Sequence, residues 1–140
     1  MSVIVTDTGF APDDWTREVI SADELSAETP PGVDLTSDAN PKDLSERLSK
    51  IELIRVDFPK SADGRGFTIA RKLRLMGYRG RLRAKGHVIA DQYAMARRAG
   101  FDEVEIDKGL AQRQPQDQWL ARASWREHDY QSRLRSAAFS

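Results

Sequence analysis

Cysteine is absent from the sequence. Its absence excludes a disulfide framework, a redox dithiol, a thiol nucleophile and an iron–sulfur cluster held by protein thiolates. Histidine is scarce as well. His87 and His128 stand far apart with no cysteine beside either, so no metal site is predicted. Redox chemistry would require a bound cofactor. The sequence does not identify one, because it contains neither a flavin-binding nor a nicotinamide-binding fingerprint.

Long apolar runs are also missing. No stretch approaches the ~20 apolar residues of a membrane span, and the N-terminus has only a short apolar run before Asp7. We therefore expect a cytoplasmic protein that does not engage a membrane. Neither sign of charge is in excess, because Lys plus Arg number 22 and Asp plus Glu number 22. Such a chain lacks the basic field that draws proteins onto nucleic acid, so no nucleic-acid partner is predicted.

What is present fits one soluble domain. Hydrophobic residues make up 39% of the chain and charged residues 31%, which suits an ordinary core without disulfide or metal cross-links. The run TPPG at 29–32 breaks any regular element. We therefore predict a single α/β domain over 1–140. Its three segments are an N-terminal hairpin over 1–31, a core of strand-helix repeats over 32–108 and a helical tail over 109–140.

Strands and helices alternate through the core. This alternation implies parallel crossovers. Four sequential right-handed units place all their helices on one side of the sheet, which is the topology of half a (β/α)8 barrel. The N-terminal hairpin is expected to pair strands at 3–5 and 17–20, with a turn near Thr8 and Gly9. The predicted core strands span 32–36, 51–58, 81–85 and 103–106, and the predicted helices span 41–49, 67–76 and 88–99.

Side chains alternate between apolar and polar along each core strand. Because alternate side chains of a strand point to opposite faces, one face of the sheet is apolar and the other is charged. We expect the charged face to be exposed, with opposite charges facing one another across strands. Three interpretations stay open: a solvated face with surface ion pairs, a ligand cleft, or a surface for homo-oligomer assembly. The polar face comprises Asp34, Thr36, Arg55, Asp57, Arg81, Arg83, Lys85, Glu103, Glu105 and Asp107.

The loop over residues 58–67 follows the second core strand, at the carboxyl edge where α/β folds place their sites. Its glycines let the backbone approach a ligand, and its cations beside a helix N-terminus suit phosphate, sulfate or sulfite. The alternative is an Asp63-Gly64 turn whose cations face solvent. The predicted ligand-binding residues are Lys60, Asp63, Gly64, Arg65, Gly66, Arg83, Gly86, Asp91 and Gln92.

Three further features have two interpretations each. His87 is an exposed loop residue or a titrating group of the site, and its role is unassigned. Asp91 and Gln92 cap a helix or reach the cleft. Tail aromatics such as Trp119 and Trp125 close the end of the domain or dock another chain.

A resemblance rests on the motifs DFPK at 57–60, DGRGF at 63–67 and GFD at 100–102. On these, the stretch 54–106 resembles a bacterial family, domain of unknown function 934, described as probable oxidoreductases involved in sulfite reduction. Ser61 departs from this pattern where the family is aromatic, and His87 where it is acidic. The resemblance implies a role in sulfite assimilation and assigns no catalytic residue. Further matching residues are Ala70, Leu73, Arg74, Gly77, Tyr78, Gly80, Leu82, Arg83, Ala84, Gly86, Val88, Asp91, Gln92, Arg98 and, more loosely, Tyr130 and Gln131.

Three hypotheses of function follow. The resemblance implies an accessory protein or small subunit that acts with sulfite reductase or another sulfur-assimilation enzyme. The second hypothesis is an enzyme in its own right, with Asp57 or Asp63 as general base and Lys60, Arg65 and Arg83 holding an anionic substrate. The third is an assembly scaffold without catalysis. The sequence leaves open whether the protein is an enzyme.

Overall fold

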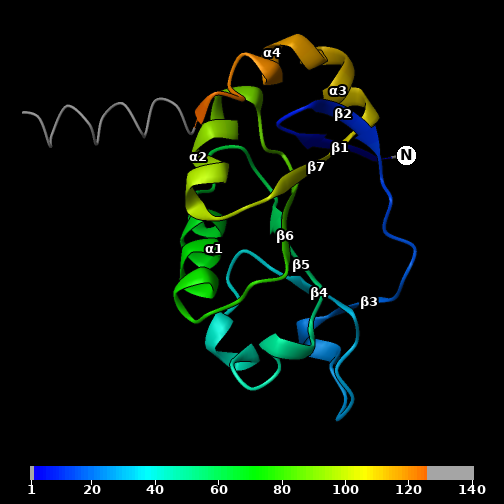
Figure 1. The fold of residues 1–140 in the computed structure, drawn as a ribbon, viewed down its shortest axis with the longest axis vertical. Coiled ribbons are helices and arrows are strands. Elements are labelled where there is room, and N and C mark those ends of the chain that lie inside the picture. The colour runs from blue at the N-terminus through cyan, green and yellow to red at the C-terminus, as the bar shows by residue number, and fades with distance from the viewer. Residues whose placement is uncertain (1, 126–140) are drawn as a thin grey trace, which may run out of the picture.

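The fold is built on one seven-stranded sheet with helices packed against it (Figure 1). The structure, a computed structural model, describes residues 2–125. The strands lie in the order β2-β1-β7-β6-β5-β4-β3, so the protein is mixed α/β, as predicted. The strands are β1 (Ser2–Thr6), β2 (Gly9–Pro12), β3 (Val19–Ser21), β4 (Gly32–Leu35), β5 (Leu53–Phe58), β6 (Arg81–Gly86) and β7 (Glu103–Asp107). The helices are α1 (Arg65–Leu75), α2 (Tyr93–Ala99), α3 (Lys108–Arg113) and α4 (Gln116–Leu120), with 3₁₀ turns η1 (Ala22–Glu24), η2 (Pro41–Leu44), η3 (Leu48–Lys50) and η4 (Ala90–Gln92).

The four predicted core strands form the centre of the sheet. Strands β4, β5, β6 and β7 pair in parallel in unbroken sequence order, which confirms the predicted crossovers. Strand β3 adds a further parallel strand beside β4, and β1 pairs antiparallel with β7 on the other side. The carboxyl ends of five parallel strands therefore meet at one edge of the sheet.

The N-terminal hairpin pairs different strands from those expected. Strand β1 pairs with β2, and the register places Thr6 opposite Gly9 across a two-residue connection. Gly9 has φ 116°, a conformation that favours glycine and lets the chain reverse tightly. The expected partner, residues 17–20, was therefore wrong: β3 lies at the opposite edge of the sheet, beside β4.

The first predicted helix, residues 41–49, forms the 3₁₀ turns η2 and η3 rather than an α-helix. The Asn40 side chain accepts a hydrogen bond from the Lys42 backbone N–H, and the following backbone bonds span three residues. Leu44 and Leu48 are both buried, as their shared apolar face predicted. The tighter turns bury both leucines within a short connection, so packing overrides the helical spacing. The other two predicted helices are observed as α1 and as η4 followed by α2.

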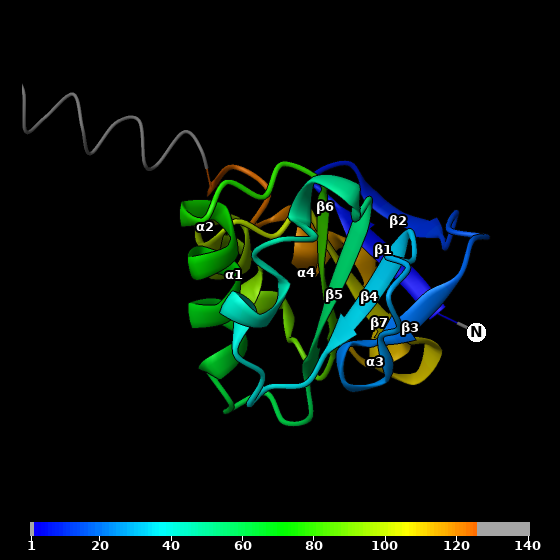
Figure 2. The same cartoon turned by 90° about the horizontal axis from the view of Figure 1, so that it is seen from below.

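Helices α1 and α2 lie side by side on one face of the sheet (Figures 1 and 2). Against this face the Phe58 ring packs between other aromatics, with its centroid 5.0 Å from that of Phe67 and 5.8 Å from that of Phe101. The predicted apolar face is thus the core of the protein. Its buried strand residues are Val33, Leu35, Ile54, Val56, Phe58, Leu82, Ala84, Val104 and Ile106.

The opposite face carries the predicted charged residues, but its centre is not exposed. Arg83 is 0% exposed, Glu103 5% and Glu105 3%. The segment 13–18, between β2 and β3, passes over this face, and Asp13 Oδ1 lies 3.2 Å from Nη1 of Arg83. The expectation of an exposed charged face is therefore wrong at its centre. Alternation along the strands assigns side chains to a face but does not reveal which other segment covers that face.

The tail closes one end of the domain. Trp119 in α4 is 1% exposed, its Nε1 donates a hydrogen bond to the Gln114 carbonyl at 2.9 Å, and its ring meets Tyr93 edge-on. This position confirms the first interpretation of the tail for Trp119. The predictions for His128, Tyr130 and the rest of the tail after residue 125 lie outside the described residues.

Two general properties follow from the described part of the chain. None of its helices has the length and apolar character needed to cross a membrane. Within residues 2–125, His, Asp and Glu side chains form no group of three or more that could hold a metal ion.

Candidate functional site

The loop between β5 and α1 lies at the carboxyl edge, as predicted, but its main charges neutralise each other. The Arg65 backbone N–H donates to Asp63 Oδ1 at 3.1 Å, and Arg65 Nη2 donates to Asp63 Oδ2 at 2.7 Å and to Ser37 Oγ at 3.0 Å. The hydrogen bond from the Arg65 side chain lowers the pKa of Asp63 to about 2. Asp63 is therefore a weak base, and Arg65 already has a carboxylate partner.

The two glycines of this loop have different roles. A Cβ on Gly66 would lie 2.4 Å from the ring of Phe58, which is 1% exposed. A Cβ on Gly64 would meet nothing within 4 Å, and Gly64 has φ −86°. Gly66 is thus required by the packing of α1 on the sheet, whereas Gly64 is not required by contacts or by backbone conformation.

We predict that Gly66→Ala lowers the free energy of unfolding by about 1–3 kcal/mol, because the added methyl group overpacks a buried ring. Gly64→Ala is the matched control. It should change the free energy of unfolding by less than about 1 kcal/mol, since alanine restricts the unfolded chain but is a poorer N-cap residue than glycine. Urea denaturation followed by circular dichroism measures both variants, and equal effects of the two substitutions would contradict this assignment of Gly66.

Arg83 is the centre of a buried charge network rather than part of the loop. Its Nε donates to Glu103 Oε2 at 2.7 Å and its Nη1 to Glu105 Oε1 at 2.6 Å. Its Nη2 is buried without a hydrogen-bond partner among residues 2–125, 4.0 Å from Asp14 Oδ1. With two buried carboxylates already beside it, the guanidinium has little charge to offer an anion at the carboxyl edge.

The network continues across neighbouring strands. Arg81 donates from Nε to Glu103 at 2.8 Å and from Nη2 to Asp14 at 2.7 Å, and these hydrogen bonds, that to Glu103 first, raise the pKa of Arg81 above its ordinary value. Arg55 binds both carboxylate oxygens of Asp34, at 2.6 and 2.8 Å. Glu103 and Asp34 thus lie on strands next to those of their arginines. The third carboxylate, Asp14, comes from the segment 13–18.

The remaining predicted ligand residues hold the loops at this edge in place. Gly86 has φ 121°, and a Cβ there would lie 2.6 Å from the Phe58 carbonyl oxygen. Gln92 Nε2 donates to the Ser61 carbonyl at 2.5 Å, and its Oε1 accepts from the Ile89 backbone N–H at 3.1 Å. Asp91 pairs on the surface with Arg122. The capping interpretation therefore holds for Gln92, which also ties the β5–α1 loop to the turn before α2.

A basic cavity of about 580 Å³ opens at the same edge. Lys60 follows β5, His87 follows β6 and Arg113 ends α3, so three connections after successive strands bring these side chains together. No Asp or Glu of residues 2–125 lines the cavity. Within residues 2–125, no carboxylate is paired with Lys60 or Arg113. The full lining is Pro59, Lys60, Ser61, His87, Ile89, Leu110, Arg113 and Gln114.

Arg113 is the residue that sequence reasoning missed. It was assigned to the tail, although α3 starts directly after β7, and a helix that directly follows a parallel strand begins at the carboxyl edge. That connection length was the available signal. Of the predicted ligand residues, Lys60 lines the basic cavity, Gln92 supports its rim, and Arg65 and Arg83 are committed to other partners.

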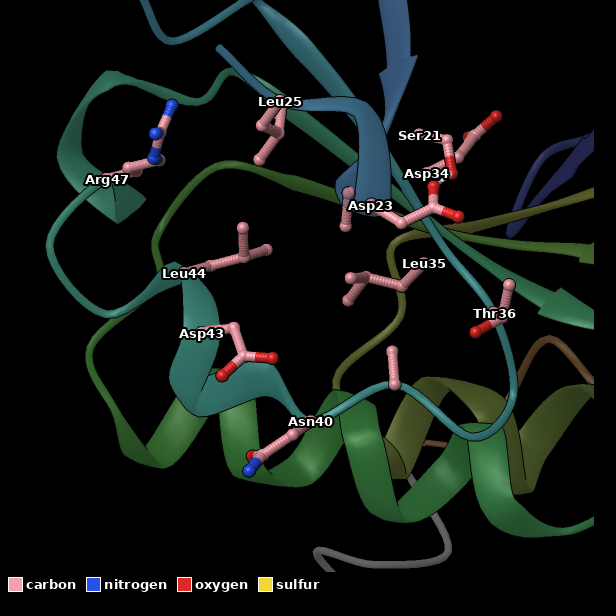
Figure 3. A pocket seen from close by; sticks show the side chains of 12 residues that line it. Ser21, Asp23, Leu25, Asp34, Leu35, Thr36, Asn40, Asp43, Leu44 and Arg47 are labelled. Atoms are coloured by element: carbon pink, nitrogen blue, oxygen red, sulfur yellow. Dashed lines mark hydrogen bonds between the residues drawn. The ribbon is translucent and has the colours of Figure 1, made fainter. Parts of the chain in front are cut away.

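Two further cavities adjoin each other near the ends of β3 and β4. The larger, of about 380 Å³, lies between η1 and η2, and Leu25, Leu35 and Leu44 point into it (Figure 3). The smaller, of about 200 Å³, reaches Asp57 and Lys85 on the charged face. The residues common to both linings are Ser21, Asp34, Leu35 and Thr36.

Comparison with known proteins supports the family part of the resemblance. A family model described as "Bacterial protein of unknown function (DUF934)" matches residues 32–139. Neither the curated proteins nor the solved structures compared with this chain include a match. The matched region begins at β4 and contains the parallel strands β4 to β7, the β5–α1 loop and the whole basic cavity. The chain therefore belongs to this family of bacterial proteins of unknown function.

Proposed function

We propose that the protein is an accessory protein or small subunit of assimilatory sulfite reduction that binds a small oxyanion, such as sulfite, in the basic cavity. The pathway is inferred from the motifs at 57–60, 63–67 and 100–102, which resemble proteins described as acting in sulfite reduction. The observation that supports anion binding is the cavity lining, in which Lys60 and Arg113 meet no carboxylate from the described residues.

The location of the cavity supports this proposal. We take strands β4 to β7 as the counterpart of half a (β/α)8 barrel, a fold in which ligands bind at the carboxyl ends of the strands. Strands β5 and β6 end at Phe58 and Gly86. Lys60 and His87 follow within two residues, so their side chains start from a rigid sheet rather than from a long loop. Rigid supports favour a preorganised site.

The chemistry of the lining suits a sulfur oxyanion. A lysine ammonium and an arginine guanidinium both form charge-assisted hydrogen bonds to such oxygens, and arginine can bind two of them at once. Apolar residues, among them Ile89 and Leu110, form part of the wall. An apolar wall lowers the local dielectric constant and strengthens each of these contacts.

We predict that sulfite raises the melting temperature of the purified protein. At a hundredfold excess over the dissociation constant, one bound ligand stabilises the fold by about 2.7 kcal/mol, which corresponds to roughly 8 °C for a chain of this size. Differential scanning fluorimetry in sodium sulfite, with sodium sulfate as a second oxyanion and sodium chloride at equal ionic strength as the baseline, measures the shift.

Variants assign that shift to the cavity. Lys60→Gln and Arg113→Gln should each remove most of it, whereas Arg65→Gln should retain it because Arg65 is paired with Asp63. No shift with either oxyanion, or a shift lost only in Arg65→Gln, would overturn the proposed site.

The proposed partner is tested separately. Tagged protein from cells grown on sulfate should co-purify with sulfite reductase or another sulfur-assimilation enzyme, and deletion of the gene should slow growth on sulfate.

If the protein is instead an enzyme in its own right, Asp57 is the better of the two candidate general bases. Asp63 is held by Arg65, and its low pKa makes it a poor proton acceptor at neutral pH. Asp57 lies at the carboxyl end of β5 without an ion pair in the described part of the chain. An enzyme would therefore use Asp57. Assembly of copies through the charged face is less favoured, since the segment 13–18 occupies the centre of that face.

A further inference from the structure

Asp57 and Lys85 stand side by side at the rim of the charged face. They are register partners in the parallel pair β5 and β6, so their backbones lie about 4.7–4.9 Å apart and both side chains point to the same side of the sheet. Both line the cavity of about 200 Å³ that opens between β3 and β6, together with Ser21, Asp34, Thr36 and others.

Lys85 makes only a long ion pair, because its carboxylate partner on the neighbouring strand is hydrogen-bonded to other residues. Glu105 is the register partner of Lys85 on β7. However, Glu105 Oε1 accepts hydrogen bonds from Arg83 at 2.6 Å and from Arg55 at 3.4 Å, and its Oε2 accepts from Ser2 Oγ at 3.2 Å. The distance from Lys85 Nζ to Glu105 Oε2 is 4.0 Å, beyond hydrogen-bond length, and the Lys85 side chain is 42% exposed.

Asp57 is free for a similar reason. Arg55, on the same face of the same strand, uses Nε and Nη2 on Asp34 and Nη1 on Glu105. Asp57 itself is exposed and has no hydrogen bond or ion pair with any of residues 2–125. Among residues 2–125, the cavity thus presents a carboxylate without an ion pair and an ammonium with only a long ion pair, beside a fixed, neutral Arg55–Asp34 pair.

We propose that this cavity binds an amino acid through its zwitterionic backbone, with the ligand ammonium on Asp57 and the ligand carboxylate on Lys85. A simple anion in this cavity would be repelled by Asp57, and a simple cation by Lys85, while the neutral Arg55–Asp34 pair favours neither. A zwitterion meets an opposite charge at both ends, which gives two charge-assisted hydrogen bonds. The adjoining cavity of about 380 Å³ (Figure 3), which shares Leu35 with this one, receives the side chain.

The size of the cavity sets the class of ligand. Pockets for drug-sized molecules occupy about 300–1,000 Å³, so a space of about 200 Å³ has room for the ammonium and carboxylate of a small molecule. The site shares no lining residue with the basic cavity. This inference therefore stands independently of the proposed sulfite site.

Isothermal titration calorimetry of the full chain with glycine, L-serine and L-leucine tests the proposal. We expect at least one of these amino acids to bind, and acetate and ethylamine, which each carry one of the two charges, to bind at least about tenfold more weakly. Binding by none of the three amino acids, or binding of acetate as tight as that of the amino acids, would overturn the proposal without any variant.

Variants then locate the site. Asp57→Asn and Lys85→Gln should each weaken amino-acid binding by at least about tenfold, and both positions are exposed enough for the fold to tolerate the change. Lys60→Gln should leave amino-acid binding unchanged while it removes the sulfite response. If Asp57→Asn and Lys85→Gln bind amino acids as the wild type does, this site is wrong, whatever the result with sulfite.

Discussion

Replacement of Arg83 by methionine is expected to lower the free energy of unfolding by about 3–5 kcal/mol. The Arg83 side chain is completely buried and donates to Glu103 and Glu105, which are less than 10% exposed. Methionine fills much of the volume but removes the positive charge, so two carboxylates stay in a low-dielectric environment without their common partner. Urea denaturation at neutral pH measures the loss.

Two further variants show whether buried charge is the cause. Asp14→Asn removes a carboxylate that is 70% exposed and pairs with Arg81, so it should cost less than about 1 kcal/mol. Replacing Glu103 and Glu105 by glutamine in the Arg83→Met background should restore part of the lost stability, because neutral amides tolerate burial better than carboxylates. An Arg83→Met protein as stable as Asp14→Asn would show that the network contributes no more than surface ion pairs.

Replacement of Trp119 by alanine is expected to destabilise the fold by about 3–5 kcal/mol. Trp119 is 1% exposed, packs edge-on against Tyr93 with ring centroids 6.1 Å apart, and donates to the Gln114 carbonyl. Alanine would leave a cavity under α4 and an unpaired carbonyl. Because Gln114 also lines the basic cavity, the variant should weaken sulfite binding in addition to lowering the melting temperature.

The neighbouring Leu120 gives a matched control in the same helix. Leu120 is 39% exposed, so Leu120→Ala should change the free energy of unfolding by less than about 1 kcal/mol. Thermal unfolding followed by circular dichroism compares the two variants. Similar losses for Trp119→Ala and Leu120→Ala would mean that the tail does not close the core as the structure indicates.

Sequence reasoning worked best where a local period controls the structure. The alternation of Ile54, Val56 and Phe58 with Arg55 and Asp57 is a period of two residues, and the structure keeps these sets on opposite faces. It predicted less where contacts between distant segments determine the structure. Residues 41–49 have helical spacing of their leucines but form 3₁₀ turns, and the strand expected at 17–20 forms at 19–21 and pairs with β4 instead of completing the hairpin.

The candidate sites were likewise predictable only in part. The sequence pattern predicts the order of the parallel strands, and this order places Lys60 and His87 at the same edge of the sheet. The commitment of Arg65 to Asp63 and of Arg83 to Glu103 does not follow from any pattern, because one arginine can pair with several nearby carboxylates. Side-chain distances are needed to tell a paired cation from a free one.

The sequence by itself determined the parallel strand order, the two faces of the sheet and the edge at which the connecting loops gather. These properties depend on residue periods and on the handedness of short connections, which are local. Only the tertiary structure decided that the segment 13–18 covers the charged face, that Arg113 joins Lys60 and His87, and that Asp57 and Lys85 line one cavity without a hydrogen bond to each other. Each of these features depends on contacts between segments that are distant in sequence and meet only in the folded chain. Local residue patterns do not predict such contacts.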